Sequence, residues 1–131
     1  MKRFLAVLLA FIIMSLSLPV YASDYEGHWA ENEIGYLVEN GIVNGDAQGV
    51  RPEAYITRAE FAAVINRNFN FNTPASEGFK DISEKDWYYK DMLFAKEAGY
   101  MVGDDNGYCN PNKNITRAEA ATVYYRLLKP E

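Results

Sequence analysis

Two arginines, Arg58 and Arg117, are the residues whose type and position best fit a binding role. Each follows a threonine in the same four-residue motif, Thr-Arg-Ala-Glu. In such a motif the threonine hydroxyl accepts a hydrogen bond from the third helical amide, and the glutamate accepts one from the threonine amide. Each motif therefore predicts a helix start, with a guanidinium among amides that have no partner within the helix. An arginine is unfavourable there by roughly 0.3–1 kcal/mol, because that helix end carries partial positive charge, so its presence needs another reason.

A carboxylate ligand would supply that reason. Arginine binds a carboxylate through two parallel hydrogen bonds, and glycines in the loop before each motif would let a ligand approach the backbone closely. We therefore predict that an acidic ligand is bound by Arg58, Arg117, Gly45, Gly103, Asp46 and Asp104. A structural alternative stays open, in which each arginine pairs with one of these aspartates or another acid and fixes the loop to the helix.

Two tryptophans at matched positions, Trp29 and Trp87, are open to two interpretations. Each could stack on a sugar ring, but a tryptophan on the apolar side of a first helical turn is more often part of the core. We expect a structural role first.

His28 has no second histidine or cysteine at ligand spacing, and the single Cys109 is expected to be a partly buried small apolar residue. We predict no metal site and no cofactor.

Acidic pairs are the only candidates for catalysis. Glu31 with Glu33, and Asp104 with Asp105, could act as paired carboxylates. Glycoside hydrolysis, however, needs two carboxyl groups at a fixed separation in a deep cleft, which short helical hairpins hardly provide. The segment from Asp104 to Gly107 has some character of a calcium loop, yet no glutamate closes a loop of EF-hand length. We therefore predict that the protein is not an enzyme.

The candidate residues lie in two copies of one unit, and this repetition organises the chain. Starting from Trp29 and Trp87, the same offsets give glycine, aspartate and glutamate at matched positions, and one residue of slippage precedes the Thr-Arg-Ala-Glu motifs. The main pairs are Glu39 with Glu97, Gly41 with Gly99, Gly45 with Gly103, Asp46 with Asp104, Pro52 with Pro111, and Arg67 with Arg126. Chance does not plausibly produce such a match.

Each copy is predicted to form a helix, a glycine-rich loop and a second helix. Apolar residues between His28 and Asn40 fall at helical spacing, and Phe61, Ala62 and Ile65 form an apolar stripe after the first motif. Thr57 with Glu60, and Thr116 with Glu119, are predicted helix caps. We therefore predict an all-α fold of two helix-loop-helix repeats packed as a small helical bundle, with repeats at residues 23–68 and 79–128 and a linker at residues 69–78.

The N-terminus has the features of a secretory signal peptide. Lys2 and Arg3 precede an apolar run, and Val20-Tyr21-Ala22 fits the cleavage pattern, which predicts removal of residues 1–22. The whole chain has 13 Lys and Arg against 18 Asp and Glu, so cleavage leaves 11 against 18, a net charge of −7. An acidic exported domain with scattered basic residues argues against a nucleic-acid partner and against membrane association after cleavage.

Three segments of the first copy, Gly27-His-Trp-Ala30, Gly41-Ile-Val-Asn-Gly45 and Ile56-Thr-Arg-Ala-Glu-Phe61, closely resemble the S-layer homology family. The second copy adds Phe79-Lys-Asp-Ile82, which is similar to that family's opening Phe-x-Asp-Val. The resemblance covers about residues 24–128. It implies all-helical modules that hold exported proteins non-covalently to secondary cell-wall polysaccharides, commonly ones bearing pyruvate ketals. Members typically use three repeats with pseudo-threefold symmetry, whereas two are present here.

The resemblance implies a secreted protein retained at the bacterial cell wall or S-layer by binding of wall polysaccharide. Under this interpretation Arg58 and Arg117 carry the recognition. The alternative is a protein-interaction module, in which the repeats complete a bundle with a second copy or with another S-layer homology protein. Apolar side chains expected to be exposed, Tyr36, Tyr89 and Phe94, motivate that alternative.

Overall fold

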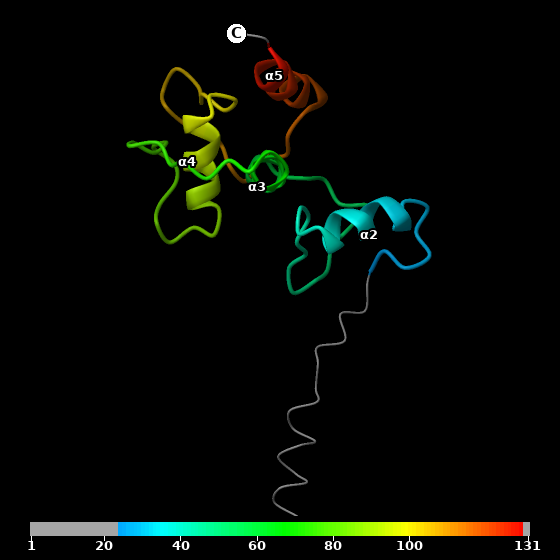
Figure 1. The fold of residues 1–131 in the computed structure, drawn as a ribbon. Coiled ribbons are helices and arrows are strands. Elements are labelled where there is room, and N and C mark those ends of the chain that lie inside the picture. The colour runs from blue at the N-terminus through cyan, green and yellow to red at the C-terminus, as the bar shows by residue number, and fades with distance from the viewer. Residues whose placement is uncertain (1–23, 130–131) are drawn as a thin grey trace, which may run out of the picture.

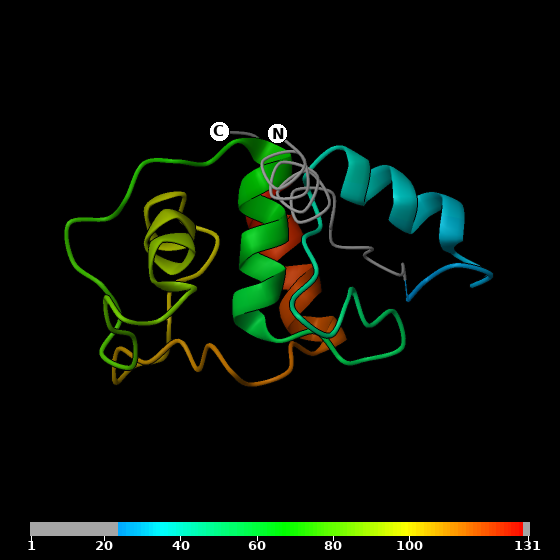
Figure 2. The same ribbon diagram turned by 90° about the horizontal axis from the view of Figure 1, so that it is seen from below.

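The computed structural model describes residues 24–129, so the predicted signal peptide and its cleavage site lie outside the described residues. Within this range the chain forms α2 (Glu31–Glu39), α3 (Arg58–Phe69), α4 (Tyr89–Glu97) and α5 (Arg117–Leu128), and no strand (Figure 1). The predicted all-α fold is confirmed. Figure 2 shows α3 and α5 running in nearly the same direction, and α2 and α4 lie on either side of α3 in both views.

None of the described helices could cross a membrane. From α2 to α5, each is too short and too polar to cross a bilayer.

Both Thr-Arg-Ala-Glu motifs form capping boxes, as predicted. The Thr57 hydroxyl accepts a hydrogen bond from the Glu60 amide at 3.2 Å, and Glu60 Oε2 accepts one from the Thr57 amide at 2.8 Å. Thr116 and Glu119 repeat this geometry with the same two distances at the start of α5. The two longest described helices therefore begin where the local sequence places their first turns.

A carboxylate near the start of each copy holds the end of that copy's glycine loop. Asp24 accepts hydrogen bonds from the amides of Val50 and Arg51, at 2.9 and 2.6 Å. Asp81 does the same for Cys109 and Asn110, at 3.0 and 2.7 Å. Arg51 and Asn110 both adopt a positive φ, at 55° and 52°. Each carboxylate therefore ties a strained loop end to the beginning of its own copy.

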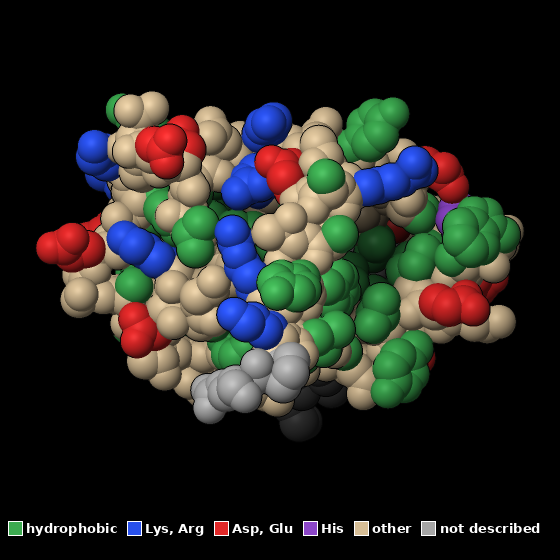
Figure 3. All heavy atoms as spheres, turned by 90° about the horizontal axis from the view of Figure 1, so that it is seen from above, with side chains coloured by type: hydrophobic (Ala, Val, Ile, Leu, Met, Phe, Trp, Pro, Cys, Tyr) green, Lys and Arg blue, Asp and Glu red, His purple; other side chains and the backbone are tan. Residues whose placement is uncertain are grey.

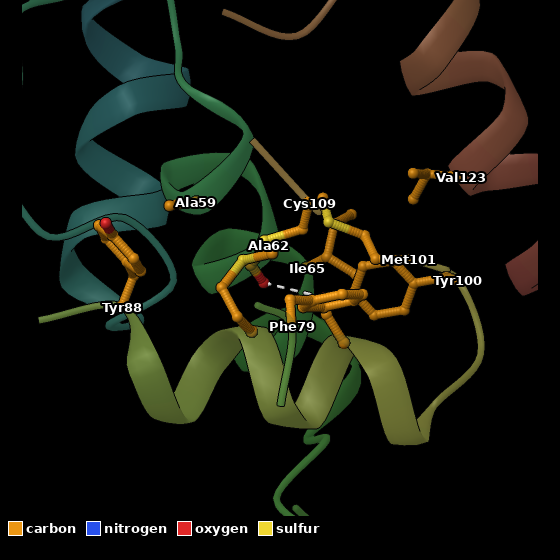
Figure 4. Close-up of a cluster of buried hydrophobic side chains, with 11 residues drawn as sticks. Ala59, Ala62, Ile65, Phe79, Tyr88, Tyr100, Met101, Cys109 and Val123 are labelled. Atoms are coloured by element: carbon orange, nitrogen blue, oxygen red, sulfur yellow. Dashed lines mark hydrogen bonds between the residues drawn. The ribbon is translucent and has the colours of Figure 1, made fainter. Parts of the chain in front are cut away.

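The core lies between the two copies, where α3 of the first packs on α4 and the loop of the second. Small side chains on α3 let these segments approach closely, and α5 adds a side chain to the same cluster (Figure 4). Its buried members are Ala59, Ala62, Ile65, Phe79, Tyr88, Met92, Ala95, Tyr100, Met101, Cys109 and Val123. Cys109 is 1% exposed, and burial raises the pKa of its thiol to about 12, so it remains a protonated core residue.

Hydrogen bonds inside this core join α3 to the second copy. The Tyr100 hydroxyl donates to Asn66 Oδ1 at 2.7 Å and lies 3.2 Å from the Ala62 carbonyl, the contact drawn in Figure 4. Asn66 Nδ2 donates to the backbone and side-chain oxygens of Asp91, at 2.9 and 3.0 Å. Burial raises the pKa of Tyr100, so the phenol keeps the proton that it donates. Every member of this chain of bonds has a partner in the other copy.

The core role expected for the two tryptophans is wrong. Trp29 is 87% exposed and Trp87 is 63% exposed. In each copy the following residue takes the inward position instead, Ala30 in the first and Tyr88 in the second, both buried. Both tryptophans lie in turns just before α2 and α4, so helical periodicity does not set the direction of their side chains.

Exposed apolar residues on the first helices are fewer than expected. Tyr36 on α2 is 64% exposed, as predicted, whereas Tyr89 and Phe94 on α4 are half-buried. The difference follows from packing, because α4 lies against α3 while α2 has no buried residue.

Removing either helix cap is expected to destabilise the fold. Thr57→Ala and Thr116→Ala should each lower the free energy of unfolding by about 1 kcal/mol, because the third helical amide loses its partner. Urea unfolding followed by circular dichroism measures this change. Thr73→Ala, at an exposed position in the connection between the copies, is the matched control and should leave stability unchanged; equal losses in all three variants would contradict the capping role.

The loop-holding carboxylates predict a loss of stability in acid. Amide hydrogen bonds from Val50 and Arg51 hold the pKa of Asp24 below 3.8. Burial tends to raise the pKa of Asp81, but amide bonds from Cys109 and Asn110 outweigh it, so that pKa is also below 3.8. Because both folded-state pKa values are depressed, this stability is present above pH 3.8 and is lost as the pH falls through the folded values. Urea midpoints measured across this range should fall more steeply for the unaltered chain than for Asp81→Asn.

Candidate functional site

A groove of about 500 Å³ opens between α2, α3 and the glycine loop of the first copy. Figure 3 shows hydrophobic side chains gathered around a hollow on the α2 side of the molecule. The groove carries both apolar and polar groups. Its principal lining residues are Ile34, Leu37, Val43, Gly45, Asp46, Val50, Arg51, Tyr55, Glu60, Ala63, Arg67 and Trp87. Trp87 belongs to the second copy, so the groove is built by both copies.

The four loop residues predicted to bind ligand shape their own loops. A Cβ on Gly45 would lie 2.8 Å from the Gly49 backbone, and one on Gly103 would lie 3.1 Å from both the Phe79 ring and the Tyr108 carbonyl. The paired aspartates close the turns that follow. Asp46 accepts a hydrogen bond from the Gln48 amide at 2.7 Å, and Asp104 accepts from the amides of Asn106 and Tyr108, both at 2.9 Å. Gly45 and Asp46 line the groove; Gly103 and Asp104 do not.

Arg51 is a charged residue of the groove that sequence analysis did not single out. Its guanidinium lies 2.8 Å from Glu60 Oε1 and 3.1 Å from Asp46 Oδ2, while its buried Nε has no hydrogen-bond partner within the described residues. Burial tends to raise the pKa of Glu60, but hydrogen bonds from Thr57 and Arg51 lower it overall. The groove therefore holds Arg51 between two acidic side chains, and the lowered pKa keeps Glu60 ionised. The only sequence signal of this arrangement was an arginine directly before Pro52, where the second copy has asparagine.

Arg58 is already bonded within the chain. Its Nε donates to the Cys109 carbonyl at 2.7 Å and its Nη1 to Glu119 Oε1 at 3.0 Å, and its side chain is 15% exposed. The structural alternative considered for these arginines therefore describes Arg58 in this conformation, with Glu119 rather than an aspartate as the acid. Arg58 joins the start of α3 to the loop and to the last helix of the second copy.

Arg117, the matched residue, lies in different surroundings. It is exposed, and within residues 24–129 its side chain makes no hydrogen bond or ion pair. The ammonium group of Lys113 is 4.0 Å from Glu119 Oε1, so two cationic side chains, those of Arg58 and Lys113, lie beside one carboxylate at the start of α5. A hydrogen bond from the Thr116 amide, with the nearby charges of Arg58 and Lys113, lowers the pKa of Glu119. The two predicted arginines are thus not equivalent.

The repeated pattern that builds this site matches the family model of the S-layer homology domain at residues 23–62 and 78–121. The chain belongs to the S-layer homology family. It is 30% identical over 128 residues to an amylopullulanase of Thermoanaerobacterium thermosulfurigenes, covering 89% of this chain and 7% of that protein. It is also 30% identical over 121 residues to the surface-layer 125 kDa protein of Lysinibacillus sphaericus, covering 90% and 10%. With the S-layer protein sap of Bacillus anthracis the identity is 33% over 105 residues, covering 78% and 13%.

Family membership makes this chain a surface-anchoring module of the exported, cell-wall or S-layer associated type. The S-layer homology domain is a non-catalytic module, and the chain spans between 7% and 15% of the length of the curated relatives it matches. The hydrolase names among those relatives therefore describe their whole chains. Among residues 24–129 no three His, Cys, Asp or Glu side chains are grouped as metal ligands.

The different surroundings of the two arginines predict different effects on stability. Arg58→Ala should lower the free energy of unfolding by about 2 kcal/mol, because a charged hydrogen bond to a carbonyl and one to a carboxylate are lost together. Arg117→Ala should stay within about 0.5 kcal/mol of the unaltered chain, as expected for an exposed side chain. Urea unfolding of both variants decides this, and equal losses would contradict the asymmetry.

Proposed function

We propose that this chain anchors its protein to the cell wall by binding an acidic wall polysaccharide non-covalently, with pyruvate ketals as the recognised groups. The observation that carries the proposal is the unpaired state of Arg117. The Arg117 guanidinium and the amides of Arg117 and Ala118 have no hydrogen-bond partner within the described residues. A pyruvate carboxylate is the kind of group that would satisfy them.

The start of α5 favours an anion for two reasons. Unpaired amides at a helix N-terminus point outward and carry partial positive charge, and an arginine can bind a carboxylate through two parallel bonds. Lys113 and Arg58 add positive charge around Glu119, which has a single negative charge. Arg58 contributes in this proposal mainly by orienting α5, since two of its N–H groups already bond to the second copy and its side chain is only 15% exposed.

Exposed aromatic side chains would provide the sugar contacts. Trp29, Tyr55 and Trp87 are 87%, 85% and 63% exposed, and flat aromatic faces of this kind stack on sugar rings. Their exposure supports the stacking alternative that sequence analysis left open. Gly45, Gly103, Asp46 and Asp104 would act by giving the two loops their shape, because their polar groups and close backbone approaches are used within the loops.

A non-catalytic role for the whole described chain is part of the proposal. Asp104 is one of the acids considered for catalysis, and its Oδ1 accepts hydrogen bonds from two backbone amides of its own loop. The adjacent Asp105 is exposed. A carboxylate that holds a turn on the surface is poorly suited to general acid or base catalysis, which needs a group positioned beside the reacting bond.

The proposal is tested by binding of the exported protein to purified wall polysaccharide, before and after chemical removal of pyruvate. Arg117→Ala should weaken binding about tenfold or more, because a charge-assisted contact is lost. Arg117→Lys should restore the binding only in part, since lysine cannot form the paired bonds. Trp87→Ala should weaken binding to pyruvylated and depyruvylated polymer alike.

Lys90→Ala is the matched control, because Lys90 is an exposed cation on a different helix, α4. It should bind like the unaltered chain. Unchanged binding by Arg117→Ala, or equal binding to polymer with and without pyruvate, would contradict the proposed recognition.

A further inference from the structure

The contact between the two copies provides a template for a second contact that is not made within the described chain. At the existing contact, α3 of the first copy lies against α4 and the loop of the second. The inward face of α3 includes Ala59 and Ala62, both fully buried, and Asn66, which is 2% exposed. The matched positions on α5 are Ala118, Ala121 and Tyr125, and all three are exposed. We call these three residues the open helix face.

The groove beside α2 is the matching receptor surface. In the second copy, Met92, Ala95, Met101 and Cys109 are covered by α3 and are at most 2% exposed. Their counterparts in the first copy line the groove and are half-buried: Ile34, Leu37, Val43 and Val50. Four apolar side chains that are core in one copy therefore form an accessible wall in the other.

Backbone groups repeat this complementarity. At the existing contact the Arg58 amide donates to the Lys113 carbonyl and the Ala59 amide to the Pro111 carbonyl, both at 2.9 Å. The matched amides at the start of α5 are those of Arg117 and Ala118, which are unpaired within the described residues.

The matched acceptors lie in the first loop. They are the carbonyls of Ala54 and Pro52, which accept no hydrogen bond within residues 24–129. The two donors on α5 and the two acceptors in the first loop are thus free, whereas their matched groups at the existing contact are hydrogen-bonded to each other.

Side-chain sizes also fit. At the existing contact the large residue is in the receptor and the small one on the helix, where Tyr100 bonds to Asn66. At the matched positions the order is exchanged, with Ile42, next to the lining residue Val43, in the first loop and Tyr125 on the helix. A smaller receptor residue leaves room for a larger helix residue, so the combined volume of the pair is roughly kept, which cores tolerate best.

We propose that α5 of another molecule of this protein docks in the groove of the first repeat. This contact would match the one within a single chain, where α3 of the first repeat docks on the second repeat. The occupant comes from another molecule because α5 of the same chain is held beside α3, by the Phe61 to Tyr124 ring contact at 6.2 Å and the bond from Arg58 to Glu119. The contact is head-to-tail, since the helix face of one molecule meets the groove of the next.

This inference goes beyond the polysaccharide proposal and does not rest on it. Docking would place Arg117 near the Val50 carbonyl of the neighbouring molecule, as Arg58 now lies near that of Cys109. Polysaccharide and a second copy would then compete for Arg117, so association is measured without polysaccharide.

The test uses the exported protein in analytical ultracentrifugation from about 1 to 200 µM, which covers weak to moderate affinities. The unaltered chain should associate as concentration rises. Ala121→Glu, which blocks the helix face, and Leu37→Glu, which blocks the groove, should each weaken association at least tenfold, because a charge would be buried against apolar side chains. Thr73→Glu is the control and should associate normally.

Mixing the two blocked variants is the decisive step. The Ala121→Glu chain keeps a working groove and the Leu37→Glu chain keeps a working helix face, so the mixture should form one-to-one heterodimers and stop there. Circular dichroism and urea unfolding establish that each variant is folded, and Ile34→Glu replaces Leu37→Glu if that variant is not. A strictly monomeric unaltered chain, or two folded variants that fail to pair, would overturn the inference, while polysaccharide binding measured separately would be unaffected.

Discussion

The structure depends on one packing interaction, the insertion of the first copy's helix α3 against α4 and the loop of the second copy. Alanines at the contact allow close approach, and the hydrogen bonds among Tyr100, Asn66 and Asp91 fix its register from inside the core. Because a buried polar group that loses its partner costs roughly 1–3 kcal/mol, this register is strongly preferred over its neighbours. A helix from one repeat therefore completes the core of the other, and the two copies form one body.

The same interaction makes two repeats with the same motifs unequal. The first copy donates its helix and receives none, so α2 has no buried residue and a groove remains beside it. The second copy receives a helix and donates none, so α5 keeps an exposed face and an unpaired start. Arg58 and Arg117 occupy the same motif, yet the first is bonded across the copies and the second is exposed. A single asymmetry thus accounts for the anchoring site proposed at Arg117 and for the groove.

Features fixed by local chemistry could be predicted from the sequence, and those fixed by packing between copies could not. The capping boxes at Thr57 and Thr116 need only a threonine and a glutamate three residues apart, so both helix starts were recognised. Trp29 and Trp87 are exposed because the next residue, Ala30 or Tyr88, takes the buried position in the turn before each helix, and the spacing of apolar residues does not resolve a shift of one position. The sequence could not predict that Arg58 is bonded and Arg117 exposed, because two identical Thr-Arg-Ala-Glu motifs contain no information about their neighbours in space.

Native-state hydrogen exchange tests most directly whether one copy's helix completes the core of the other. If it does, amides of α3 and α4 should exchange with the same, highest opening free energy, close to that of global unfolding, while amides of α2 exchange through a smaller local opening. If each copy instead folded as an independent unit, α2 would share its opening free energy with α3, and α4 would share its own with α5. That second pattern would contradict the account.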